Sequence, residues 1–106
     1  MRFIDLEIVV DVVTETLLTK APRGARIEIA KRRGINRSIV TDAIRRIESE
    51  MGVSLFEPDS VTLTPSGQAM AEHGPQFIEA QRIFVKFVKT GRRRTRSENP
   101  NKDNSL

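Results

Sequence analysis

The chain lacks cysteine, tryptophan and tyrosine, and it has one histidine among its 106 residues. Without cysteine it has no disulfides and no thiolate metal ligands, which fits a reducing compartment. Five phenylalanines are its only aromatic residues, so it offers little stacking surface for single-stranded nucleic acid. His73 has no nucleophile or further metal ligand near it in the sequence. We therefore expect no enzymatic activity, no metal and no cofactor.

Long apolar runs are also missing. The segment Phe3–Val13 is interrupted by Asp5, Glu7 and Asp11, whereas a signal peptide has an uninterrupted apolar region. No segment approaches the roughly 20 apolar residues that span a bilayer. We expect a cytoplasmic protein with no membrane segment, and the length favours one small domain.

The net charge of +4 is unevenly distributed along the chain. Residues 1–19 carry one basic and four acidic side chains, a net −3, and residues 20–46 carry nine and two, a net +7. Residues 47–90 are again negative, with three and six, and residues 91–106 have a net +3 from five and two. Such clustering of positive charge is typical of a surface that binds a polyanion, although runs of charge often only solvate a helix face.

Residues 25–51 have the pattern of a helix-turn-helix. A helix over residues 25–33 leads to Gly34, which can adopt the positive φ of a helix C-cap. Asn36 is a favourable N-cap for a second helix over residues 37–51. In motifs of this kind the second helix enters the DNA major groove. Apolar residues of the second helix recur on one face: Val40, Ala43, Ile44, Ile47 and Met51.

The segments on either side complete a small helical domain. Phe3–Leu18 has a helical period, with apolar residues at spacings of three and four. The alternating Val-Thr-Leu-Thr run at residues 61–64 predicts a short β-wing over residues 54–63. The apolar stripe of the first helix consists of Phe3, Leu6, Val10, Val13 and Leu17.

Two further helices are predicted after the wing. Thr64 and Pro65 are typical of a helix start. Pro75 should kink or end that helix, because it lacks a donor N–H. A last helix over residues 76–90 should end at Gly91.

In this order, the motifs resemble the N-terminal DNA-binding domain of LysR-type transcriptional regulators over roughly residues 4–90, with the ModE-type winged helix a near neighbour. The matching residues are Ala30, Ile44-Arg45-Arg46-Ile47-Glu48, Met51-Gly52-Val53-Ser54-Leu55-Phe56-Glu57 and Leu63-Thr64-Pro65-Ser66-Gly67. The resemblance implies a mainly α fold: a winged helix-turn-helix with a short β-wing and a C-terminal dimerisation helix. We expect a DNA-binding domain over 1–64, linker and dimerisation helices over 65–91, and a basic, disordered tail over 92–106.

The start of the second helix of the motif holds the candidate base-contacting residues Arg37, Ser38, Thr41 and Asp42. Arg37 is the best candidate for a bidentate contact with guanine. Asp42 could accept from cytosine, but an ion pair with Arg45 or Arg46 is the favoured alternative. It also stands where LysR-type proteins often have arginine. The candidate phosphate contacts are Lys31, Arg32, Arg33, Arg45, Arg46, Arg92, Arg93, Arg94 and Arg96.

The last helix predicts a homodimer. Its apolar residues at helical spacing, which the resemblance assigns to dimerisation, are Phe77, Ala80, Phe84, Phe87 and Val88. We expect a homodimeric repressor that binds double-stranded DNA and occludes a promoter, with no small-molecule effector. Two alternatives stay open: an accessory DNA-architecture or DNA-processing protein of a mobile element, and a protein-binding adaptor (an antiactivator) built on a winged fold.

Overall fold

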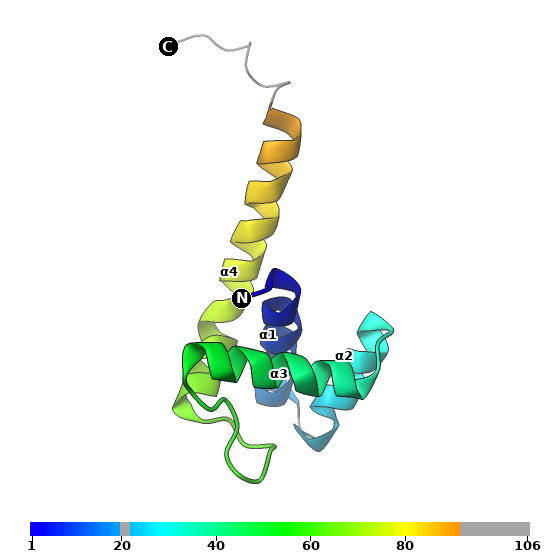
Figure 1. Ribbon diagram of the computed structural model, residues 1–106, viewed down its shortest axis with the longest axis vertical. Coiled ribbons are helices and arrows are strands. Elements are labelled where there is room, and N and C mark those ends of the chain that lie inside the picture. Colours follow the sequence, from blue (N-terminus) through cyan, green and yellow to red (C-terminus); the bar gives the residue numbers. More distant parts are fainter. Residues whose placement is uncertain (20–21, 92–106) are drawn as a thin grey trace. The chain divides into compact units, whose positions relative to one another are not determined.

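The computed structural model describes residues 1–19 and 22–91, and within them the fold is mainly helical (Figure 1). Two units are distinguished, Met1–Pro75 and the chain from Gln76 onward, and each is described by itself. The predicted domain boundary after residue 64 stays a prediction, and the predicted tail over 92–106 lies outside the described residues. The elements are α1 (Phe3–Leu18), the 3-10 turn η1 (Pro22–Gly24), α2 (Ala25–Arg33), α3 (Arg37–Met51) and α4 (Pro65–Thr90).

Helix α1 forms the centre of the first unit. Val9, Val12 and Val13 are fully buried there, because α2 and α3 both pack against α1. The predicted helix is confirmed. The prediction that its apolar stripe stays buried as far as Leu17 is wrong. Leu17 is 42% exposed, since it lies in the last turn of α1. The buried surface of α1 is broad and also includes Asp5 and Thr16.

The turn between α2 and α3 has the predicted geometry. Gly34 adopts the left-handed conformation, with φ 66° and ψ 38°, which glycine reaches without the steric cost of a Cβ. The backbone N–H of Ile35 donates to the carbonyl of Ala30 at 3.0 Å, which closes the end of α2. Asn36 occupies the N-cap position of α3 in an extended conformation, but its side chain makes no capping hydrogen bond.

Helix α3 buries one face against α1. Val40, Ala43 and Ile47 are fully buried, as the spacing predicts. Met51 was predicted to join this face, and that prediction is wrong, because the side chain is 42% exposed. Met51 is the last residue of α3, and the chain turns away at Gly52, which has a φ of 69°.

The segment predicted as a β-wing is a loop. No strand occurs within residues 1–19 and 22–91, and Phe56 and Leu63 form only an isolated bridge. The carboxylate of Asp59 accepts hydrogen bonds from the backbone N–H groups of Val61 and Thr62 at 3.0 and 2.9 Å. Asp59 thus builds a tight turn between the two segments, and α4 begins at Pro65, two residues after Leu63, so the pairing does not extend beyond the bridge. The prediction of a β-wing is therefore not confirmed.

Helix α4 begins where Thr64 and Pro65 predict. The Thr64 hydroxyl accepts from the backbone N–H of Gly67 at 3.0 Å, a side-chain N-cap. Gly67 lies against the carbonyl of Leu55, where a Cβ would clash. The separate last helix over residues 76–90 is a wrong prediction, because α4 continues through Pro75 to Thr90. A proline removes one backbone donor from the helix, and the flanking turns tolerate that loss here.

Candidate nucleic-acid interface

The first turn of α3 presents polar side chains to solvent. Arg37 and Ser38 are exposed, and within the described part of the chain neither has a hydrogen-bond or ion-pair partner. Thr41 lies one turn later and is partly buried. These three predicted base-contacting residues thus share the N-terminal half of one helix, where the side chains of a helix-turn-helix reach base edges.

Asp42, the fourth predicted base contact, is engaged within its own helix. Its carboxylate accepts from the Arg45 guanidinium at 3.2 Å, with both side chains more than half exposed. This is the predicted intrahelical alternative, and an exposed pair of this kind opens at low cost. Beside it lies a shallow hollow of about 300 Å³ lined by Asp42, Arg45, Arg46 and Ser49.

Two of the three basic residues that end α2 are bound to α1. Arg32 donates to Glu15 at 2.7 Å, and Arg33 donates to Asp11 at 2.8 Å. The hydrogen bond with Glu15 is the largest of the effects that raise the pKa of Arg32. Lys31 is exposed and has no partner among the residues described. The predicted positive patch is therefore partly neutralised by the acidic first helix.

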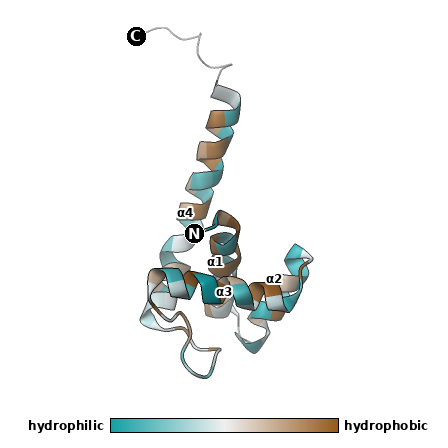
Figure 2. Cartoon of the chain, in the orientation of Figure 1, coloured by the Kyte–Doolittle hydropathy of each residue, from teal (hydrophilic) through white to brown (hydrophobic). Residues whose placement is uncertain are grey.

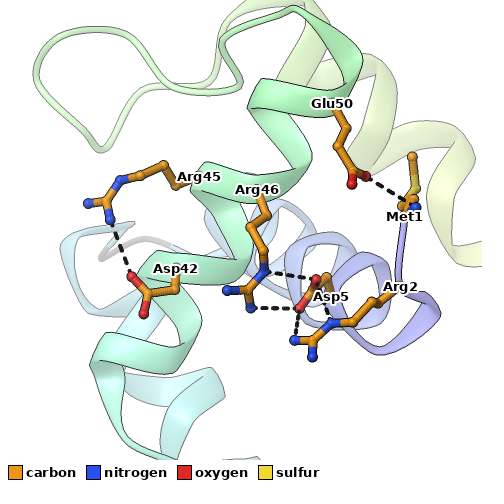
Figure 3. A network of polar contacts seen from close by, with 7 residues as sticks. All are labelled: Met1, Arg2, Asp5, Asp42, Arg45, Arg46 and Glu50. Atoms are coloured by element: carbon orange, nitrogen blue, oxygen red, sulfur yellow. Dashed lines mark hydrogen bonds and ion pairs between the residues drawn. The ribbon is translucent and has the colours of Figure 1, made fainter.

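Arg46 is also held by α1, through Asp5, whose side chain is 3% exposed. Its Nε and Nη2 donate to the two oxygens of Asp5, each at 3.0 Å. Arg2 donates to the same two oxygens at 3.1 and 2.9 Å (Figure 3). Hydrogen bonds from Arg2, then from Arg46, hold the pKa of Asp5 well below its usual range.

Sequence reasoning missed Arg2 and Asp5 as parts of this surface. A signal existed, because Asp5 is an acidic residue inside an otherwise apolar helical segment. A carboxylate in such a place is rarely buried without a cationic partner. The identity of the partner could not be read, since Arg46 is 41 residues away.

The loop over residues 56–63 is fixed to the start of α2. The Arg26 guanidinium lies 4.4 Å from the centre of the Phe56 ring, and its Nη1 donates to the carbonyl of Ser60 at 2.8 Å. Burial lowers the pKa of Arg26. Hydrogen bonds from Thr62 and Val61 hold the pKa of Asp59 at about 2. The tip of this loop thus carries a stable negative charge.

Helix α4 carries the predicted dimer residues. Phe77 is 48% exposed, Phe84 66%, Phe87 55% and Val88 64%, and Ala80 is exposed as well. Figure 2 shows hydrophobic positions, in brown, recurring along this part of the helix. The predicted phosphate contacts Arg92, Arg93, Arg94 and Arg96 lie outside the described residues.

Two other kinds of site are not found. The described ranges contain no group of three or more histidine, cysteine and acidic side chains suited to a metal ion. No helix in them has the length and apolar character needed to cross a membrane.

In this chain a first helix packs on a helix-turn-helix, and the second helix of that motif exposes unpaired polar side chains. This arrangement is typical of a DNA-binding domain. Residues 4–68 match the model of a bacterial regulatory helix-turn-helix protein, lysR family. This match covers more than half of the chain, so the chain belongs to the LysR family, as the sequence motifs predict. The family implies sequence-specific binding to double-stranded DNA and regulation of transcription. No curated protein and no solved structure matches the chain.

Proposed function

We propose that this chain is a homodimeric repressor that reads duplex DNA with the N-terminal half of α3 and occludes a promoter. One observation carries the proposal. Arg37 and Ser38 are exposed and have no partner within residues 1–19 and 22–91, while Arg45 and Arg46 of the same helix are ion-paired. An arginine without an intramolecular partner can donate its guanidinium fork to guanine O6 and N7. Ser38 and Thr41 add hydrogen bonds to bases or phosphates.

Phosphate contacts come from the residues around this reading surface. Lys31 has no partner in the described part and can meet a phosphate directly. Arg45 needs only to leave an exposed pair. Arg32 and Arg33 donate to carboxylates of α1, so they contribute less positive charge than their number suggests. Such contacts orient the protein on the duplex without reading sequence.

The test of the proposed function is selection from a library of random duplexes. A dimer should enrich a palindrome whose half-sites lie about one helical turn apart, ~10 base pairs. If the protein instead covers many duplexes with weak preference, the DNA-architecture alternative is favoured. If it binds no duplex at low salt, where phosphate contacts are strongest, the adaptor alternative is favoured. Either result contradicts the proposal.

The exposed apolar face of α4 supports the dimer. Phe77, Ala80, Phe84 and Phe87 follow one another at spacings of three, four and three, the spacing of the apolar positions in a coiled coil. Large apolar side chains that are about half exposed or more, concentrated on one helix, mark an interaction surface. Two copies of this face can bury each other.

Phe84→Asp tests the dimer. A carboxylate in the centre of an apolar contact between two helices is strongly unfavourable, so we expect a folded monomer by sedimentation. The matched control is Lys86→Asp, which places the same carboxylate on another face of the helix and should leave the dimer intact. A wild-type protein that sediments as a monomer at micromolar concentration would contradict the proposal.

The basic tail is proposed to track phosphates. Each lost phosphate contact makes the slope of log affinity against log salt shallower by ~0.9. Removing residues 92–106, with Arg92, Arg93, Arg94 and Arg96, should therefore change the slope by at most roughly 3.6. The change should be equal on a selected duplex and on an unrelated one. An unchanged slope on both would show that the tail takes no part in binding.

A further inference from the structure

Arg2, Asp5 and Arg46 form a cluster at the contact between α1 and α3. Each guanidinium donates its Nε and Nη2 to the Asp5 carboxylate, at distances between 2.9 and 3.1 Å. The side chain of Asp5 is 3% exposed, while those of Arg2 and Arg46 are 66% and 46% exposed. In the described part of the chain, the Nη1 of both arginines keeps its N–H groups without a partner.

The cluster carries a net charge of +1, because two guanidinium groups share one carboxylate. An ordinary ion pair on this surface, such as Asp42–Arg45, is neutral. Two adjacent arginines would repel one another without the carboxylate. The hydrogen bond with Asp5 and the charge of Asp5 raise the pKa of Arg2, against the smaller, opposing effect of Arg46. Asp5 therefore holds two cationic groups together, with donors that remain free at the surface.

The position of the cluster on α3 suggests its ligand. Arg46 lies on the helix whose first turn carries Arg37, and it lines the shallow hollow together with Asp42, Arg45 and Ser49. When the first turn of such a helix enters a major groove, the flanks of the helix face the phosphates that border the groove. Guanidinium groups bind phosphate oxygens with charge-assisted hydrogen bonds.

We infer that Arg2 and Arg46, held by Asp5, form a preorganised clamp for one phosphate of the DNA backbone. The arginine clamp, defined as these three residues, rests on the proposed DNA-binding function and adds a contact from the first helix. Long side chains lose rotamer freedom when they are ordered on binding. In the clamp the carboxylate has already ordered them, so Asp5 is a positioning residue that never touches the DNA.

The first test is Arg2→Ala, which removes one exposed arm of the clamp and leaves the Asp5–Arg46 pair. The cluster becomes neutral, so the complex should lose one phosphate contact. The slope of log affinity against log salt should then become shallower by ~0.9. The loss should be equal on selected and unrelated duplexes. The control is Lys89→Ala, which removes one positive charge from the last turn of α4 and should leave the slope unchanged.

The second test compares the DNA affinities of two variants that carry the same net charge. Asp5→Asn and Glu50→Gln each raise the net charge by one, and Glu50 is a carboxylate of α3 near the cluster, 3.5 Å from the amino group of Met1 (Figure 3). If only overall charge matters, both variants bind DNA more tightly. The clamp predicts tighter or equal binding for Glu50→Gln, and binding weakened severalfold for Asp5→Asn, because its two arginines are released.

The outcomes separate the clamp from the proposed function. A wild-type protein that binds no duplex overturns the proposed function. A wild-type protein that binds, with Arg2→Ala leaving the slope unchanged, overturns the clamp alone. Tighter binding by a folded Asp5→Asn variant also overturns it. If Asp5→Asn does not fold by circular dichroism, the slope of Arg2→Ala decides, since Arg2 is exposed and its loss leaves Asp5 paired.

Discussion

The arginines in the two halves of α3 differ in whether they have an ion-pair partner. Arg37 in the first turn has no carboxylate partner in the described part of the chain, whereas Arg45 and Arg46 in the second half each donate to one. The partner of Arg46 is Asp5 of α1, and the partner of Arg45 is Asp42 of α3 itself. Arg46 is therefore already ordered in the folded protein, whereas the guanidinium of Arg37 has all of its hydrogen-bond donors left for a ligand.

Carboxylates of α1 also pair with two arginines of α2. Arg32 and Arg33 donate to Glu15 and Asp11 of α1. Lys31, which precedes them in α2, has no partner among the described residues. The net charge of a segment is therefore a poor guide to the charge that it offers to DNA. The comparison between the two halves of α3 can be tested by changing residues on each side of it.

The largest effect is expected at Asp5, which holds Arg46 of the second half of α3 against α1. Asp5→Asn should lower the free energy of unfolding by about 3 kcal/mol at neutral pH, the lower end for breaking a buried ion pair, because the arginines left behind reach solvent. Chemical denaturation measures it. A change below 0.5 kcal/mol, roughly what an exposed pair gives, would contradict a structural role for Asp5.

The pH dependence sharpens this prediction. The pKa of Asp5 is lowered in the folded state, so its contribution is complete above the unfolded pKa of about 3.9 and is lost as the pH falls further. The difference in unfolding free energy between the wild type and Asp5→Asn should therefore shrink from pH 6 toward pH 2. A constant difference would show that the ionised carboxylate is not responsible.

The next largest effect is expected at Arg37, in the first half of α3, and it is a loss of base discrimination. Arg37→Ala should lose ~1–3 kcal/mol of discrimination at one base pair of each half-site, since a bidentate contact with guanine is worth that much. Competition binding with duplexes that differ at single base pairs measures the loss. The thermal stability should stay unchanged, because the exposed side chain of Arg37 makes no hydrogen bond or ion pair with another described residue. Equal losses at every position would make Arg37 a phosphate contact instead.

The smallest effect is expected at the boundary between the halves. Asp42→Asn breaks an exposed pair with Arg45, which should change the unfolding free energy by no more than about 0.5 kcal/mol. Overall DNA affinity should rise slightly as a negative charge is lost. A changed preference at one base pair would instead show that Asp42 accepts from cytosine, the other assignment made from the sequence.

The helices were predictable because their signals are local. Gly34 as a left-handed C-cap and Thr64 with Pro65 as a helix start depend only on neighbouring residues, and both predictions are confirmed. The continuation of α4 through Pro75 was missed, because the cost of a proline in a helix depends on what the rest of the helix gains. The described part of the chain has no wing strands, because α4 begins at Pro65, two residues after the bridge residue Leu63.

The candidate site was predictable in part for the same reason. The reading residues follow from their position on a helix-turn-helix. The pairing of Arg46 with Asp5 joins residues 41 positions apart, and no periodicity within one segment shows it. Long-range ion pairs of this kind need the packing of α1 against α3, which a sequence alone does not supply.

The central claim is that the first half of α3 reads sequence and the second half does not. Base-preference profiles from duplex selection test it most directly, for the wild type, for Arg37→Ala/Ser38→Ala/Thr41→Ala, and for Arg45→Ala. We expect a flattened profile for the triple variant, and for Arg45→Ala a lower affinity with the wild-type profile. An unchanged profile for a folded triple variant would contradict the claim.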